Sequence, residues 1–67
     1  DSAAGNLTKR ELEILRHLST DRPISAIARS LHISINTIKT HLKNLYRKME
    51  VDGRDSAVAK AQELYIL

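Results

Sequence analysis

The stretch Ile33–Val51, ISINTIKTHLKNLYRKMEV, decides the fold of this chain. Its apolar residues recur every three or four positions, which is typical of a helix with one buried side. We predict a helix over residues 34–50, with the Ser34 hydroxyl capping its first turn. The residues expected on its apolar side are Ile35, Ile38, Leu42, Leu45, Tyr46 and Met49. The opposite side carries amide, hydroxyl and basic side chains.

A shorter helix is predicted just before this one, over residues 24–31. Pro23 suits its beginning, because the fixed φ angle of proline is already close to the helical value. Only His32 and Ile33 separate the two helices, so a tight turn must join them. Histidine tolerates the positive φ that such a turn often requires. A short helix, a tight turn and a longer basic helix together predict a helix-turn-helix. The inward side chains expected on the shorter helix are Ile24, Ile27, Ala28 and Leu31.

Two more helices complete the prediction of an all-α, four-helix bundle. The first covers residues 8–19, where Thr8 and Glu11 have the spacing of a capping box. The turn signal Asp52–Gly53 should end the long helix, and a fourth helix should follow over residues 54–65. The buried stripe of the first helix is expected to comprise Leu12, Ile14, Leu15 and Leu18.

The 67 residues are enough for one domain. We assign residues 7–67 to it, and residues 1–6 to a linker or a remnant of cloning. The chain has no cysteine, two glycines, and three histidines on separate predicted elements. Neither an enzyme active site, nor a metal site, nor a cofactor is therefore predicted. The apolar runs are too short to span a membrane, and a cytoplasmic location is expected.

The distribution of charge is more informative than the formal net charge of +3. No acidic residue occurs between Asp21 and Glu50, whereas acidic residues cluster toward both ends of the chain. Such a basic segment favours a surface that meets phosphate, although a solvated basic face without any partner remains the alternative. The basic residues of this acid-free interval are Arg22, Arg29, Lys39, Lys43, Arg47 and Lys48.

The long helix has the side chains that DNA recognition requires. An α-helix fits the major groove of B-DNA, where lysine can bind guanine, asparagine can bind adenine and a threonine methyl can contact thymine. Lys39 and Lys43 are four residues apart and therefore point the same way. We predict sequence-specific binding to double-stranded DNA, with this helix in the major groove. The predicted base contacts come from Asn36, Lys39, Thr40 and Lys43.

Phosphate contacts are predicted from the same helix. Ser34 and Thr37 lie at its N-terminus, where free N–H groups and the helix dipole favour an anion. Basic and amide side chains further along the helix extend this surface. The full set predicted to contact phosphate is Ser34, Thr37, His41, Asn44, Arg47 and Lys48.

Some of the basic residues have competing interpretations. His41 could equally pack against the preceding helix. Lys48 could instead hold an acid or a carbonyl at the helix junction. The same choice applies to Arg54, for which we favour the junction over a phosphate. The acidic residues within reach are Asp52 and Asp55.

Four segments in order resemble the LuxR-type, or FixJ/NarL-type, helix-turn-helix domain of bacterial transcription regulators. Leu7–Glu11, with a leucine four residues later, is similar to the family start L-T-x-R-E-x-x-V/I-L, and Ile27–Ser34 is similar to I-A-x-x-L-x-I-S. Thr37–Met49 resembles T-V-K-x-H-h-x-x-I-y-x-K-L, where h is hydrophobic, and residues 51–61 fit V-x-x-R-x-x-A-x-x-x-A. Glu50 stands where that family frequently has glycine.

This resemblance implies a four-helix domain in which Lys39, Thr40 and Lys43 face the bases. It also implies that the chain is the C-terminal piece of a larger regulator, with RNA polymerase as a further candidate partner. Details of the last two helices resemble the branch of large activators that includes MalT. In this family the fourth helix commonly supplies a homodimer contact on DNA. The residues expected there are Ala57, Val58, Ala61 and Leu64, unless they simply cover the long helix.

Two other functions compete with this interpretation. A sigma-factor promoter-reading domain shares the first three helices, but such domains usually end soon after the recognition helix, and the Val51–Leu64 tail speaks against one. A protein-interaction or dimerisation module would instead use the apolar strip of the fourth helix to bind its partner.

Overall fold

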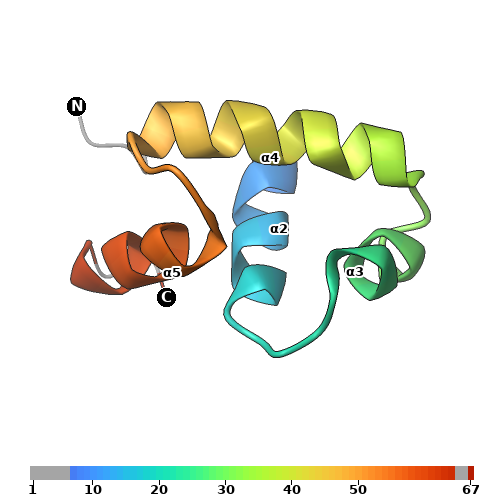
Figure 1. The fold of residues 1–67 in the computed structure, drawn as a ribbon, viewed down its shortest axis with the longest axis horizontal. Coiled ribbons are helices and arrows are strands. Elements are labelled where there is room, and N and C mark those ends of the chain that lie inside the picture. The colour runs from blue at the N-terminus through green and yellow to red at the C-terminus, as the bar shows by residue number, and fades with distance from the viewer. Residues whose placement is uncertain (1–6, 65–66) are drawn as a thin grey trace.

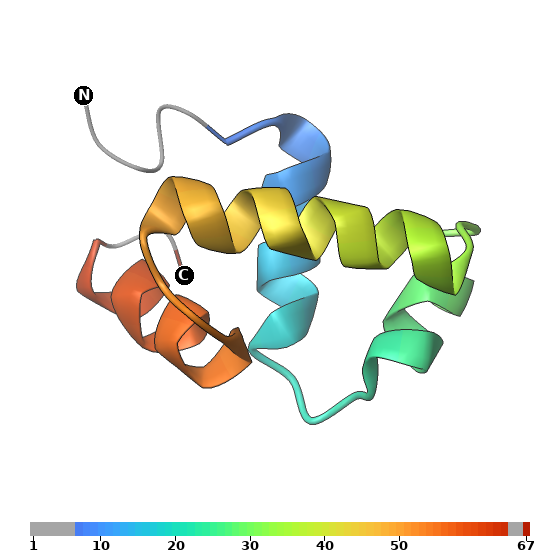
Figure 2. The ribbon, with the colours of Figure 1, turned by 45° about the horizontal axis from the view of Figure 1, so that its top comes forward.

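The computed structural model describes residues 7–64 and Leu67, and within them the fold is all-α, as predicted. The described helices are α2 (Lys9–Leu18), α3 (Ile24–Ser30), α4 (Ile35–Met49) and α5 (Arg54–Glu63). The long helix α4 lies along one side of the molecule, and α3, α2 and α5 pack beneath its N-terminal end, its middle and its C-terminal end (Figures 1 and 2). None of these described helices is long and apolar enough to cross a membrane.

The predicted caps of α2 and α4 are both present. Thr8 and Glu11 form the capping box: the Glu11 N–H donates to Thr8 Oγ1 at 3.1 Å, and the Thr8 N–H donates to Glu11 Oε1 at 2.9 Å. At the start of α4, the Thr37 N–H donates to Ser34 Oγ at 3.0 Å. These bonds satisfy N–H groups that the first turn of a helix leaves unpaired.

The turn between α3 and α4 also follows the prediction. His32 has φ 59°, in the left-handed region. The Ile33 N–H reaches back to the Ala28 carbonyl at 3.0 Å, and Ile33 packs against the core from within the turn. Pro23 is the N-cap of α3, with φ −69°. The helix-turn-helix is therefore closed by local bonds and held in place by one apolar side chain.

The core is a single cluster in which α4 contacts all three other helices. Two predictions of core residues are corrected. Ile35 is 39% exposed, and it does not belong to the core cluster. Leu12 is only half-buried, while Glu11 beside it is 3% exposed. The buried apolar residues are Ile14, Leu15, Leu18, Ile27, Ala28, Leu31, Ile38, Leu42, Leu45, Met49, Ala57 and Ala61.

The end of α4 agrees with the predicted bound to within one residue, although the turn begins earlier than Asp52–Gly53. The helix ends before Asp52–Gly53, at Glu50, whose φ of 58° is left-handed. Gly53 has an extended backbone and is instead the N-cap of α5. A left-handed residue usually costs least as glycine, so the backbone at Glu50 would suit glycine better than glutamate. The predictions for residues 1–6 and for Tyr65 fall outside the described residues.

Candidate nucleic-acid interface

The outward side of α4 presents the four predicted base-contacting side chains together. Asn36, Lys39, Thr40 and Lys43 are all exposed, and they occupy the first three turns of the helix. Their Cα atoms lie on a helix whose opposite side is anchored in the core, so the position of these side chains is set by the packing beneath them. A helix held in this way can present a rigid polar surface to a groove.

The basic residues of the acid-free interval separate into two groups. Arg22 is bound to α3, because its guanidinium donates to the Ala26 carbonyl at 3.0 Å and also to the Ser30 hydroxyl. Lys48 is bound to α2, as described below. The members that are exposed are Arg29, Lys39, Lys43 and Arg47.

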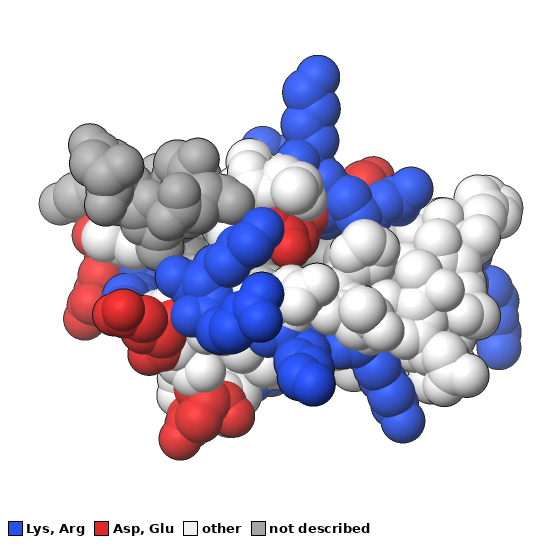
Figure 3. All heavy atoms as spheres, turned by 90° about the horizontal axis from the view of Figure 1, so that it is seen from above, with Lys and Arg blue, Asp and Glu red and all other residues white. Residues whose placement is uncertain are grey.

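Figure 3 shows how charge is arranged over the face that α4 forms. Lys and Arg side chains gather over the middle and the C-terminal part of this face. The end near α3, where α4 begins, is largely uncharged, and most of the visible acidic side chains lie toward the opposite end, with a few among the basic side chains of the middle. The positive potential is therefore concentrated along the body of α4, where it can attract a phosphate backbone.

Several polar side chains on α4 are already oriented by local hydrogen bonds. Thr40 Oγ1 donates to the Asn36 carbonyl at 3.1 Å, which leaves the threonine methyl as the part free to contact a base. The Ser34 hydroxyl donates to Thr37 Oγ1 at 2.9 Å. Arg47 donates to Asn44 Oδ1 at 3.4 Å. His41 is half-buried, and both of its predicted roles stay open.

Lys48 has a partner that the sequence did not indicate. Its Nζ lies 2.8 Å from Oε1 of Glu11, and the exposed fractions of the two side chains are 28% and 4%. Burial alone would raise the pKa of Glu11, but hydrogen bonds from Lys48 and Thr8 and the charge of Lys48 outweigh it, so the pKa is lowered. The pair joins the first turn of α2 to the last turn of α4, and a phosphate contact by Lys48 stays a prediction.

Two cations on α5 bind the C-terminal ends of other helices. Arg54 donates to the Leu18 carbonyl at 3.1 Å and to the Thr20 carbonyl at 2.6 Å, which confirms that it holds carbonyls at a helix junction. Lys60 Nζ donates to the Met49 carbonyl at 2.7 Å, and no sequence motif predicted this contact. Because helix C-termini carry unpaired carbonyls and a negative dipole end, both contacts fix α5 to the domain.

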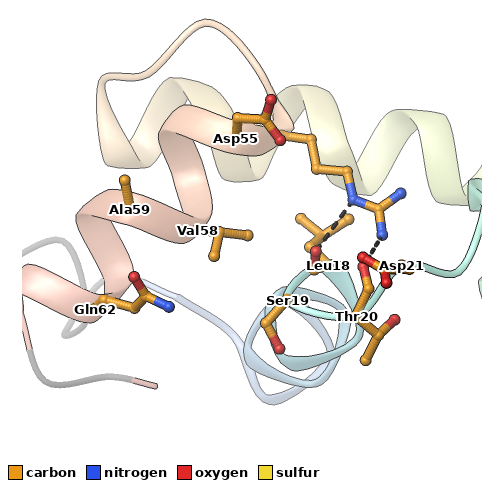
Figure 4. Close-up of a pocket in the computed structure, with 9 residues that line it drawn as sticks. Leu18, Ser19, Thr20, Asp21, Asp55, Val58, Ala59 and Gln62 are labelled. Atoms are coloured by element: carbon orange, nitrogen blue, oxygen red, sulfur yellow. Dashed lines mark hydrogen bonds between the residues drawn. The ribbon is translucent and has the colours of Figure 1, made fainter.

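The apolar residues of α5 divide between the core and the surface. Ala57 and Ala61 are fully buried, so their prediction as dimer contacts is corrected: they cover α4 and α2 within one chain. Val58 is half-buried and Leu64 is 38% exposed, and these two stay candidates. Val58 also lines an open groove of about 500 Å³ between α5 and the end of α2 (Figure 4).

Comparisons with known proteins agree with the geometry. A family model described as "Bacterial regulatory proteins, luxR family" matches residues 5–61. The CsgBAC operon transcriptional regulatory protein of Escherichia coli (strain K12) is 51% identical over 57 residues, which are 85% of this chain and 26% of that protein. The probable transcriptional regulatory protein NarL of Mycobacterium tuberculosis (strain ATCC 25618 / H37Rv) is 39% identical over 61 residues, 91% of this chain and 28% of that protein.

The HTH-type transcriptional regulator MalT of Yersinia pestis (strain Pestoides F), from the branch that the narrower resemblance indicated, is 41% identical over 58 residues. These are 87% of this chain and 6% of that protein. The chain thus spans about a quarter, or less, of the length of the curated relatives it matches. No solved structure gave a significant match.

Proposed function

Because this chain belongs to the luxR family of bacterial regulatory proteins, we propose that it binds specific sequences of double-stranded DNA with α4 in the major groove. The observation that carries this proposal is the joint exposure of Asn36, Lys39, Thr40 and Lys43 on one firmly packed helix. The family match extends through residue 61 and includes most of α5, which favours this function over a sigma-factor-like domain.

The four side chains have complementary chemistry toward base edges. Lys39 and Lys43 can donate to O6 and N7 of guanine, and Asn36 can bind adenine through N6 and N7. Thr40 can place its methyl against a thymine methyl, since its hydroxyl is already bonded to the helix backbone. Around them, the predicted phosphate contacts would fix the register of the helix on the duplex.

Substitution of the two lysines tests the base contacts. We expect Lys39→Ala and Lys43→Ala each to cost roughly 1–3 kcal/mol at a preferred site and to relax base preference at one position. We expect Arg47→Ala to weaken binding evenly across sequences. The salt slope, which is the slope of log K against log salt concentration, should become shallower by about 0.9, the contribution of one neutralised phosphate. The measurement is a gel-shift titration at several salt concentrations on a selected site and on scrambled DNA.

Arg16→Ala is the matched control, because Arg16 is an exposed cation on α2 that belongs to neither predicted contact set. Its affinity and salt slope should stay at the wild-type values. Equal losses of Lys39→Ala and Lys43→Ala on all sequences would reassign both lysines to phosphate. Binding by the wild-type chain that does not respond to salt would contradict the proposed interface.

We further propose that two copies bind together on palindromic DNA through Val58 of α5 and Leu64, the C-cap of that helix. Sedimentation of the wild-type chain with a palindromic duplex should give a complex of two chains per duplex. Leu64→Lys should reduce this to one chain per duplex, because it puts a charge into an apolar contact. Ser56→Lys, at an exposed site on the same helix that does not line the groove beside Val58, adds the same charge and should leave the stoichiometry unchanged. A strictly one-to-one wild-type complex would rule the dimer out.

Since the chain spans a small part of its relatives, we propose that it is the DNA-binding part of a longer transcription regulator that acts in the cytoplasm. RNA polymerase is then a candidate partner of the whole regulator.

A further inference from the structure

Ile35 occupies an unusual place for a large apolar side chain. It lies in the first turn of α4, where every residue of Ser34–Thr37 is exposed and Ile38 is the first buried one. Its side chain is 39% exposed, whereas the core residues of the same helix are at most 8% exposed. The fold therefore leaves part of this apolar surface in water, where a bound partner can cover it.

The surroundings of Ile35 belong to the candidate DNA interface. Lys39 follows it by four residues, so the two side chains lie on the same side of the helix, one turn apart. Asn36 is its immediate neighbour. No charged residue occurs from Ile33 to Ile38, and the face is largely uncharged where α4 begins (Figure 3). This end of the interface can therefore make an apolar contact beside the phosphate contacts predicted from Ser34 and Thr37.

On the basis of the proposed function, we propose that Ile35 determines sequence specificity by packing against the C5-methyl group of a thymine. That methyl is the one apolar group that the bases present in the major groove. Four residues of helix advance about 6 Å, close to the length of two base-pair steps. The thymine should therefore lie about two base pairs from the guanine that Lys39 contacts.

The expected size of the effect follows from the burial of one methyl group. Removal of a buried methyl costs about fourfold in affinity, with a range of roughly three- to fivefold. This loss of affinity, about fourfold, is smaller than the loss expected from removing a lysine contact. It should, however, occur at one base position only. This confinement separates a specificity contact from a general loss of binding.

The test uses the 67-residue chain and DNA in which single thymines are replaced by deoxyuridine, which lacks only the C5-methyl group. Selection from a random DNA pool first defines a preferred site. Dissociation constants are then measured for the site with each thymine replaced in turn. We expect the wild-type chain to lose about fourfold at the thymine two base pairs from the Lys39 contact, apart from a separate loss at the thymine that Thr40 contacts.

Ile35→Ala should bind the unmodified site about as weakly as the wild type binds the deoxyuridine site, and it should no longer distinguish the two. Its melting temperature should stay close to that of the wild type, since Ile35 lies outside the core. Thr40→Ser is the matched comparison, because it removes the methyl group that is predicted to contact another thymine. Thr40→Ser should still lose about fourfold in affinity when the thymine assigned to Ile35 is replaced by deoxyuridine.

Each outcome decides the matter. If Ile35→Ala keeps the penalty, or Thr40→Ser abolishes it, another residue contacts this methyl and the inference is wrong. If the wild type selects a site but shows no penalty at any thymine, the inference is wrong while the proposed function stands. If the wild type selects no site from the pool, the proposed function fails, and this inference with it.

Discussion

Leu45→Ala is expected to cost about 3–4 kcal/mol of folding free energy. Leu45 is fully buried, and it lies on the helix that contacts all three other helices. Truncation removes apolar burial and leaves a cavity that a small core can fill only in part. Because a core of this size rarely supplies more than roughly 3–5 kcal/mol in total, a large fraction of the variant should be unfolded at 25 °C.

Urea unfolding followed by circular dichroism measures this loss. Leu64→Ala is the matched control, since Leu64 is 38% exposed, and its cost should stay within about 0.5 kcal/mol. Addition of the selected DNA should raise the midpoint of Leu45→Ala, because a ligand that binds only the folded state stabilises it by mass action. A Leu45→Ala midpoint equal to that of the wild type would show that α4 is not anchored through this residue.

Lys48→Met is expected to destabilise the domain at neutral pH by about 2–3 kcal/mol, because it leaves the buried carboxylate of Glu11 without its ammonium partner. The 2.8 Å contact joins α2 to α4, and the Glu11 side chain is 4% exposed. Lys43→Met is the stability control: Lys43 is exposed on the same helix, and its replacement should change stability by less than about 0.5 kcal/mol.

The stability difference between Lys48→Met and the wild type should depend on pH. In the wild type the pKa of Glu11 is lowered below the usual 4.5, so its stabilising contribution is present above that value and is lost as the pH falls through the lowered pKa. In Lys48→Met, burial should dominate and raise the pKa of Glu11, so acid should relieve the unpaired charge. The stability difference between the two chains should therefore shrink as the pH falls from 7 toward 3.

Urea midpoints measured across this pH range test the prediction. A difference that stays constant with pH would mean that Lys48 stabilises the fold through packing rather than through its charge. In a double-mutant cycle, Glu11→Gln combined with Lys48→Met should cost less than the sum of the two single changes, since the second substitution removes the charge that the first leaves unpaired.

Much of the fold could be predicted because its signals are local. The capping box of Thr8 and Glu11, the Ser34 cap and the left-handed His32 all depend on residues within a few positions of one another. The exposed side of α4 follows equally directly from helical periodicity. The end of α4 was predicted to within one residue, but the residue that ends it is a left-handed glutamate, which no turn signal in the sequence marks.

The sequence by itself therefore determined the helices, their N-terminal caps and the polar side of α4. Only the tertiary structure decided which side chains pair with, or pack against, other parts of the domain. Lys48 pairs with an acid 37 positions away, Arg54 and Lys60 bind the ends of other helices, and two alanines of α5 enter the core. Ile35, with the same periodicity as the core residues, lies outside it. Periodicity gives the direction of a side chain, but how far its neighbours extend depends on the packing of all the helices.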